Sequence, residues 1–162
     1  MNLTDLEKFS HTVTPCGDRL NISKPFSRGE YSYATDGRLL IRVKRLVDVP
    51  EVSGAPSVKK IWPNGNYKSF PIPAFPEPKY SPCPWCTGEE PCFSADEYCE
   101  ECNNTHVQEE LNPVTIGCSS FSDHYLSKIK DLPNILIAPT GKLEAAILTF
   151  DGGGGLLMPM KI

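Results

Sequence analysis

Five cysteines lie within the twenty positions from 83 to 102 of a 162-residue chain that contains seven cysteines in total. Four of them form two CxxC pairs, Cys83-Pro-Trp-Cys86 and Cys99-Glu-Glu-Cys102, which are separated by twelve residues. This spacing suits four thiolates that converge tetrahedrally on one zinc ion, because each pair forms a tight turn that directs both sulfurs inward. The polar residues between the pairs have no core of their own, so the metal would supply the energy that folds them. The sequence therefore predicts a four-cysteine zinc module, with Zn2+ as the cofactor.

Other chemistry for these cysteines is less well supported. Disulfides are disfavoured because seven cysteines is an odd number and the chain begins without a secretion signal. A thioredoxin-like redox pair requires a surrounding βαβ pattern, which the sequence does not show. An iron–sulfur cluster is a minor alternative because Cys92 supplies a fifth thiolate, and Cys92 or His106 could replace one zinc ligand. Four thiolates close a zinc site, whereas a catalytic zinc keeps an open position, so we expect a structural metal.

The remaining polar residues do not form a catalytic motif. His11, His106 and His124 are dispersed and have no metal-ligand spacing, and Ser119-Ser120 lack the context of a nucleophile elbow. The stretch DGGGG at 151–155 lacks the Lys-Ser/Thr pair and the helix of a phosphate-binding loop, so we interpret it as a flexible hairpin tip. We therefore predict that the protein is not an enzyme.

Charge is distributed unevenly along the chain. The net charge of −4 argues against a surface that binds phosphate throughout, because affinity for nucleic acid comes largely from Lys and Arg. Trp62 and Trp85 could stack on bases, but we expect them to pack against the core or the zinc turn. The candidate DNA contacts are the basic residues Arg38, Arg42, Lys44, Lys128 and Lys130. Acidic residues gather in and just after the cysteine module, at Glu89, Glu90, Asp96, Glu97, Glu100, Glu101, Glu109 and Glu110.

The segment before the cysteines predicts a helix followed by strands. Apolar residues over 3–13 recur at spacings of three and four, which is typical of an amphipathic helix, and Thr4 with Glu7 offers a capping box. Residues 19–26, RLNISKPF, alternate between apolar and polar as a half-buried strand does. Two extended runs then flank Asp36-Gly37, which is a strong hairpin signal.

The segment after the cysteines repeats this layout. PVTIGC at 113–118 predicts a strand, and HYLSKIKDL at 124–132 predicts a helix that Pro133-Asn134 would end. Three further strands are predicted by ILIAP at 135–139, EAAILTF at 144–150 and GLLMPMKI at 155–162. Each segment therefore contains a helix and antiparallel strands.

An insertion separates these two halves. The chain has sixteen prolines, and they concentrate between Pro50 and Pro91, where we expect no regular secondary structure. We divide the chain into a first half at 1–49, a proline-rich insertion at 50–111 that contains the zinc module at 83–102, and a second half at 112–162. Two helix-plus-antiparallel-sheet halves around one core predict a single α+β domain.

Neither membrane insertion nor secretion is expected. No run approaches the roughly 18 apolar residues that span a bilayer. The first residues, MNLTDLEKFS, carry acids and lack the basic-then-apolar layout of a signal peptide. We expect a cytoplasmic protein without membrane contact.

Two motifs in these halves resemble the bacterial sliding clamps, the beta subunit of DNA polymerase III. YATDGRLLIRV at 33–43 resembles the ATDGxRLA stretch in the middle domain of the clamps, and LLMPMKI at 156–162 resembles the VVMPMRL with which they end. The predicted elements from 122 to 162 also follow the last half-domain of a clamp. The resemblance, which covers both halves but not the insertion, implies one sliding-clamp-like (processivity-fold) domain with an inserted zinc knuckle. A short, solitary variant of this kind suits a phage protein that acts in the cytoplasm of a bacterial host.

The resemblance also implies a peptide pocket. In the family, the two motifs contribute to the hydrophobic pocket that captures linear peptides of polymerases and other clients, and methionine is a pliable lining for such a pocket. The two walls come from neighbouring domains in the family, so in a single domain we expect a split pocket or one completed by self-association. The matching residues here are Thr35, Gly37 and Leu40 for one wall, and Leu157, Met158, Pro159 and Met160 for the other.

The function that follows is a non-enzymatic accessory role in DNA replication or repair. It would act by binding a protein partner, with DNA binding and homo-oligomers through sheet edges as further expectations. Clamps line their channel with basic helices, whereas the two helices predicted here are nearly neutral, with Lys8, Lys128 and Lys130 against Asp5, Glu7, Asp123 and Asp131. An alternative is a phage inhibitor or decoy that engages a host complex through its acidic zinc module, in anti-defence or host takeover. A zinc-dependent nucleic-acid enzyme is a third, minor alternative.

Overall fold

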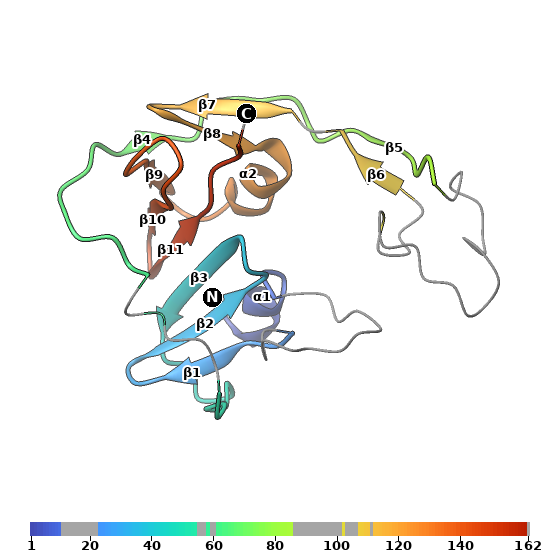
Figure 1. Ribbon diagram of the computed structural model, residues 1–162. Helices are drawn as coiled ribbons and strands as arrows, with labels where there is room; N and C mark the ends of the chain where they lie inside the picture. The colour runs from blue at the N-terminus through green and yellow to red at the C-terminus, as the bar shows by residue number, and fades with distance from the viewer. Residues whose placement is uncertain are drawn as a thin grey trace.

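The computed structural model describes residues 1–10, 23–54, 58, 61–85, 102, 107–110 and 112–161. Their centre is a seven-stranded antiparallel sheet accompanied by two short helices, α1 (Leu3–Glu7) and α2 (Asp123–Ile129) (Figure 1). This architecture confirms the predicted combination of helices with a large antiparallel sheet. The strands lie in the order β1 (Phe26–Arg28), β2 (Tyr31–Thr35), β3 (Leu39–Lys44), β11 (Gly153–Leu157), β10 (Ala146–Phe150), β9 (Leu136–Ala138) and β4 (Phe70–Pro71).

The strand order places the two halves of the chain side by side. α1 precedes the meander β1-β2-β3, α2 precedes the meander β9-β10-β11, and the last strands of the two meanders pair at the centre with Leu40 opposite Leu156. The hairpin predicted at Asp36-Gly37 joins β2 to β3. Oδ1 of Asp36 accepts the backbone N–H groups of Arg38 at 3.0 Å and Leu39 at 2.9 Å, and these bonds close the turn.

Apolar side chains are divided between the two faces of the sheet, because successive residues of a strand point to opposite sides. The larger cluster lies on the face that packs against α1 and α2, which we call the helix face. Each fully buried Leu or Ile there contributes roughly 1.5–3 kcal/mol. Members of this cluster with no exposed surface include Leu6, Ile41, Leu126 and Leu148. The opposite side, which we call the outer face, has a smaller cluster of Phe26, Tyr33, Leu40, Val58 and Leu156.

The first helix is capped by different residues from those predicted. Asn2 and Asp5 form the capping box, in place of Thr4 and Glu7. Oδ1 of Asn2 accepts the backbone N–H of Asp5 at 3.0 Å, and the Asp5 carboxylate accepts that of Asn2 at 3.2 Å. This second bond is the main cause that lowers the pKa of Asp5. The helix therefore begins at Leu3, earlier than a cap at Thr4 would place it, and its residue Leu6 is fully buried.

The glycines after Asp151 are in a strand, which corrects the prediction of a flexible hairpin tip at 151–155. Gly153, Gly154 and Gly155 belong to β11, and the turn itself is only Asp151-Gly152. A Cβ on Gly153 would lie 2.5 Å from the carbonyl oxygen of Arg42, and a Cβ on Gly155 would lie still closer to that of Leu40. The backbones of β3 and β11 therefore lie so close together that Gly153 and Gly155 cannot be replaced by a residue with a side chain unless the strands move apart.

The insertion also contains strands, although its prolines predict irregular structure. β4 pairs with β9 at the edge of the main sheet, and proline is tolerated there because an edge strand needs hydrogen-bond donors on one side only. β5 (Tyr80–Pro82) pairs with β6 (Val107–Glu109), and this two-stranded stem projects away from the sheet (Figure 1). A hairpin of β7 (Pro113–Ile116) and β8 (Ser119–Ser122) then leads into α2. The sequence predicts β7 but not β8.

Both edges of the main sheet are restricted in their capacity to pair. At one edge, Ser27 of β1 donates its backbone N–H to the carbonyl oxygen of Pro50 at 2.7 Å, and its hydroxyl donates to that of Val49 at 2.8 Å. At the other edge, β4 has two residues, of which Pro71 has no N–H to donate. Among the described residues, no helix has the length and apolar composition needed to cross a membrane.

The stem contacts the body of the protein at His124, at the start of α2. The hydroxyl of Tyr80 lies 3.3 Å from Nδ1 of His124. Burial of the imidazole, and secondarily the positive charge of Lys128, lower the pKa of His124 below its usual 6.5, against the opposing effect of Asp36 and Asp123. The folded protein therefore favours the neutral imidazole.

This shift predicts a loss of stability on mild acidification. Because the pKa of His124 is lower in the folded state, the unfolded chain binds more protons once the pH falls below about 6.5, and stability should decrease until the pH reaches the lowered folded pKa. Urea midpoints at about pH 7.5 and about pH 5 should differ less for His124→Gln than for the unmodified protein. Equal differences would show that His124 is not the titrating group.

Candidate functional site

An apolar pocket opens on the outer face of the sheet beside the β2–β3 turn. Its volume is about 290 Å3, and most of the side chains around it are apolar. They come from β1, from β2, β3 and the turn between them, and from the segment that follows β3. The others come from β11, from the residue after it, and from the residue just before β10. The lining residues are Phe26, Thr35, Gly37, Arg38, Leu39, Leu40, Val58, Ile61, Ala145, Leu156 and Met158.

Hydrogen bonds fix the wall of this pocket at the β2–β3 turn. Oγ1 of Thr35 accepts the backbone N–H of Gly37 at 3.0 Å, and Gly37 has a φ of +91°, which suits glycine. The backbone N–H of Met158 donates to the carbonyl oxygen of Arg38 at 2.9 Å. This last bond joins the end of β11 to the turn, so the two walls meet within one chain.

The structure assembles some of the predicted pocket residues and separates others. Thr35, Gly37 and Leu40 from the first motif line the pocket together with Met158 from the second. Leu157 has no exposed surface and belongs to the cluster on the helix face, because neighbouring residues of a strand point to opposite sides. Pro159 and Met160 are half-buried beyond the pocket, where the backbone N–H of Met160 donates to the carbonyl oxygen of Ser120 at 2.8 Å.

The sequence motifs did not indicate the part of the pocket that follows β3. Val58 and Ile61 complete its lining, although they lie in the segment for which we expected no regular structure. Val58 is buried, whereas the side chain of Ile61 is 56% exposed. No motif distinguished Val58 and Ile61 from the other apolar residues of this proline-rich stretch, such as Val52 and Trp62.

Two of the four predicted zinc ligands are among the described residues, and both are buried. Cys83 directly follows β5 and is fully buried, and Cys102 is 5% exposed, although Pro84 and Trp85 beside Cys83 are exposed. Cys86 and Cys99 lie outside the described residues, as do the alternative ligands Cys92 and His106. Within the ranges that the structure describes, no group of three or more His, Cys, Asp or Glu side chains could hold a metal ion. The four-cysteine site stays a prediction.

The candidate DNA contacts do not form one patch. Lys128 of α2 pairs with Asp36 at 3.7 Å and lies over the Tyr125 ring, and Lys130, which caps the end of α2, pairs with Glu77, so both lysines have local partners. Arg38 is at the rim of the apolar pocket. Arg42 and Lys44 lie further along β3, where their positions in the alternation place them on the outer face with Leu40. The five residues are thus distributed over different surfaces.

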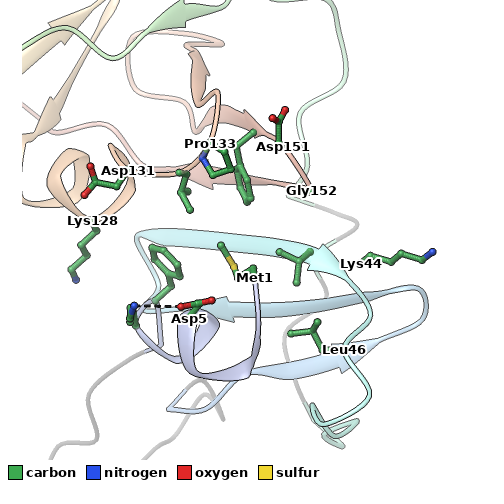
Figure 2. A pocket seen from close by; sticks show the side chains of 14 residues that line it. Met1, Asp5, Lys44, Leu46, Lys128, Asp131, Pro133, Asp151 and Gly152 are labelled. Carbon is green, nitrogen blue, oxygen red and sulfur yellow. Dashed lines mark hydrogen bonds and ion pairs between the residues drawn. The ribbon is translucent and has the colours of Figure 1, made fainter.

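A second hollow, on the helix side, lies between α1, the chain after α2 and the β10–β11 turn. Its volume is about 550 Å3. Figure 2 shows the side chain of Met1 within it, with Lys44 and Lys128 at opposite ends. Its described lining includes three lysines and three carboxylates, namely Lys8, Lys44 and Lys128 with Asp5, Asp131 and Asp151. This balance agrees with the nearly neutral helices that the sequence shows.

Comparison of the chain with protein-family models, with curated proteins and with solved structures gives no match. The function proposed below therefore rests on the pocket of the outer face and on the two motifs that form it.

Proposed function

We propose that the protein is a non-enzymatic, sliding-clamp-like accessory protein of DNA replication or repair, whose apolar pocket binds a short linear segment of a partner protein. The observation that supports this function is the meeting of Thr35, Gly37 and Leu40 with Met158 around one pocket. These residues come from the two motifs that resemble the peptide pocket of the clamps. A single chain supplies both walls, so self-association is not needed to complete the pocket.

The dimensions of the pocket favour a peptide over a cofactor. Its volume of about 290 Å3 is at the lower end of the range of ligand sites, roughly 300–1,000 Å3, and would accept one or two apolar side chains. Each such side chain would contribute roughly 1.5–3 kcal/mol when buried. Arg38 is the one charged residue among the described residues of the lining. It favours a peptide with an acidic residue beside its apolar anchors.

A labelled peptide tests this proposal. We expect a fluorescein-labelled synthetic peptide with neighbouring Leu and Phe residues and one Asp to bind the protein in an anisotropy titration. Met158→Asp should weaken this binding about tenfold or more, because it places a charge in an apolar wall. Met158 is 45% exposed, so the variant should keep the melting temperature of the unmodified protein.

The matched control is Leu143→Asp. Leu143 is another exposed apolar residue, 56% accessible, in the loop before β10, and it does not line the pocket. This variant should bind the peptide normally. The proposal would be overturned by equal losses in the two variants, or by a lack of saturable binding up to about 1 mM peptide.

The zinc module enters the proposal as a structural element displayed on its own stem. We do not include ring formation through sheet edges. At the edge formed by β1, the backbone N–H of Ser27 already bonds to the carbonyl oxygen of Pro50, and at the edge formed by β4, Pro71 has no N–H to donate. The acidic residues on which the decoy alternative depends lie largely outside the described residues. No observation therefore favours that alternative over peptide binding.

A further inference from the structure

A basic hollow lies at the opposite end of the outer face from the apolar pocket. It has a volume of about 730 Å3 and is formed by the β1–β2 turn, the end of β3 and the β10–β11 turn. Its described side chains include the three cations Arg42, Lys44 and Arg45, together with Tyr31 and one carboxylate, Glu30. Such a concentration of positive charge is unexpected in a chain with a net charge of −4.

Aromatic rings accompany these cations. The guanidinium of Arg42 lies 3.7 Å from the centre of the Trp62 ring and 4.8 Å from that of the Tyr31 ring. Trp62 also approaches Gly154, which is opposite Arg42 in β11, because a Cβ at that glycine would lie 3.9 Å from the indole, an ordinary van der Waals contact. Tyr31 is 37% exposed, so part of its ring is accessible from solvent. Arg42 thus links two rings into one aromatic surface beside the hollow.

The charges around this surface remain positive after their local pairing is considered. Arg45 bonds to Glu51 at 2.6 Å, which neutralises it. Lys44 is exposed and has no ion-pair partner within the described ranges. Arg28 lies directly opposite Tyr31 in the β1–β2 register, on the same side of the sheet. Among the described residues that line the hollow, the three cations Arg42, Lys44 and Arg45 therefore outnumber the one carboxylate, Glu30, even though Arg45 is paired with Glu51.

We propose that this hollow binds single-stranded nucleic acid, with a base stacked on Tyr31 and the adjoining phosphates against Arg42 and Lys44. Accessible aromatic rings beside cations are the combination that proteins use for single strands, because every unpaired base offers a flat face and every nucleotide a negative charge. A duplex would present its phosphates but not its base faces. The inference goes beyond the proposed peptide binding and does not depend on it, since the two sites share no lining residue.

Fluorescence anisotropy with a labelled oligothymidylate of about 16 nucleotides tests the proposal. We expect binding that weakens with salt. Lys44→Glu should reduce the affinity and should decrease the slope of log K against log salt concentration by about 0.7, the value for one lost phosphate contact on a single strand. Lys142→Glu is the charge-matched control, because Lys142 is exposed in the loop before β10 and is absent from the hollow.

Tyr31 provides an independent readout of base stacking. Tyr31→Ala should weaken binding about tenfold or more, whereas Tyr31→Phe, which keeps the ring, should bind like the unmodified protein. Melting temperatures of all variants would identify any that fail to fold. If the Tyr31 variants fail to fold, the binding of Lys44→Glu, whose substitution is at the exposed surface, tests the proposal.

Three results would overturn the proposal. One is the absence of oligothymidylate binding at low salt, and another is an equal effect of Lys44→Glu and Lys142→Glu. The third is equal competition by a DNA duplex or by polyglutamate, which would show a surface that responds to negative charge alone. A failure of the peptide experiment would leave these outcomes unchanged, because it concerns the other end of the outer face.

Discussion

Removal of zinc is expected to unfold the cysteine module and to leave the seven-stranded sheet folded. The core of the sheet is formed by residues on both sides of the insertion, such as Ile41 and Leu148, and none of its described members belongs to the predicted zinc module at 83–102. The stem below that module has only two short strands, β5 and β6, and an isolated pair of strands has marginal stability in water. Structural zinc supplies about 10–16 kcal/mol of apparent binding energy in zinc-finger peptides, so its loss should be decisive for the module alone.

Two tryptophans allow this difference to be measured. Trp85 lies between two predicted ligands and is 65% exposed, whereas Trp62 packs against the cluster on the outer face. Elemental analysis should find one zinc per chain. Chelation should change the fluorescence of Trp85, which is assigned by comparison with Trp85→Phe, while the emission of Trp62 and the melting temperature of the sheet should not change.

The cysteines outside and inside the module provide the matched variants. Cys83→Ser removes a predicted ligand and should lose the metal. Cys118→Ser removes an exposed cysteine in the β7–β8 turn and should retain it. Equal zinc contents in these two variants would contradict the four-cysteine site. Iron together with acid-labile sulfide in the purified protein would show that the cysteines bind an iron–sulfur cluster instead of zinc.

A substitution at the centre of the sheet should have the second large effect. We expect Gly155→Ala to lower the free energy of unfolding by about 3 kcal/mol, because its Cβ would overlap the carbonyl oxygen of Leu40 in the neighbouring strand. It would also lie 3.1 Å from Cδ1 of Ile41 and 3.2 Å from Cδ1 of Leu148, both of which are fully buried. Relief of the overlap would require β3 and β11 to separate where the two halves of the chain join.

The neighbouring glycine is the control for this prediction. A Cβ on Gly154 would lie 3.1 Å from the carbonyl oxygen of Leu148, a tight contact that small adjustments can relieve. Gly154→Ala should therefore cost about 1 kcal/mol or less, partly offset by the lower entropy of the unfolded chain. Urea denaturation of the two variants measures the difference. Equal midpoints would show that the sheet can widen at β3 and β11 without cost.

Local sequence patterns predicted those parts of the fold that depend on residues close together in the sequence. The turn at Asp36-Gly37 formed as expected because the aspartate side chain and the glycine conformation suffice to define it. Gly153 and Gly154 were predicted incorrectly as part of a turn, because glycine has a low intrinsic preference for strands and the close approach of β3 is not visible in the local sequence. The edge strand β4 depends in the same way on a partner, β9, that is distant in sequence.

The candidate pocket shows a similar division. Leu40 and Met158, which come from the two motifs, line one pocket within a single chain, where we expected a split pocket or one completed by self-association, and the motifs treated Leu157 and Met158 as parts of one wall. Because successive side chains of a strand point to opposite faces, Leu157 and Met158 should have been assigned to different faces of the sheet. Val58 and Ile61 could not be assigned from sequence, because no pattern indicates which sheet face a chain without regular structure will cover.

The pairing of β3 with β11 also has a consequence for biosynthesis. During translation, β3 leaves the ribosome long before β11, since the whole insertion and most of the second half lie between Lys44 and Gly153. Throughout this interval one edge of the first meander has no strand to pair with, and its apolar side chains have no complete core. Long-range pairings of this kind fold slowly and expose surfaces that aggregate. The first half of the nascent chain is therefore expected to be a client of chaperones until the final strand emerges.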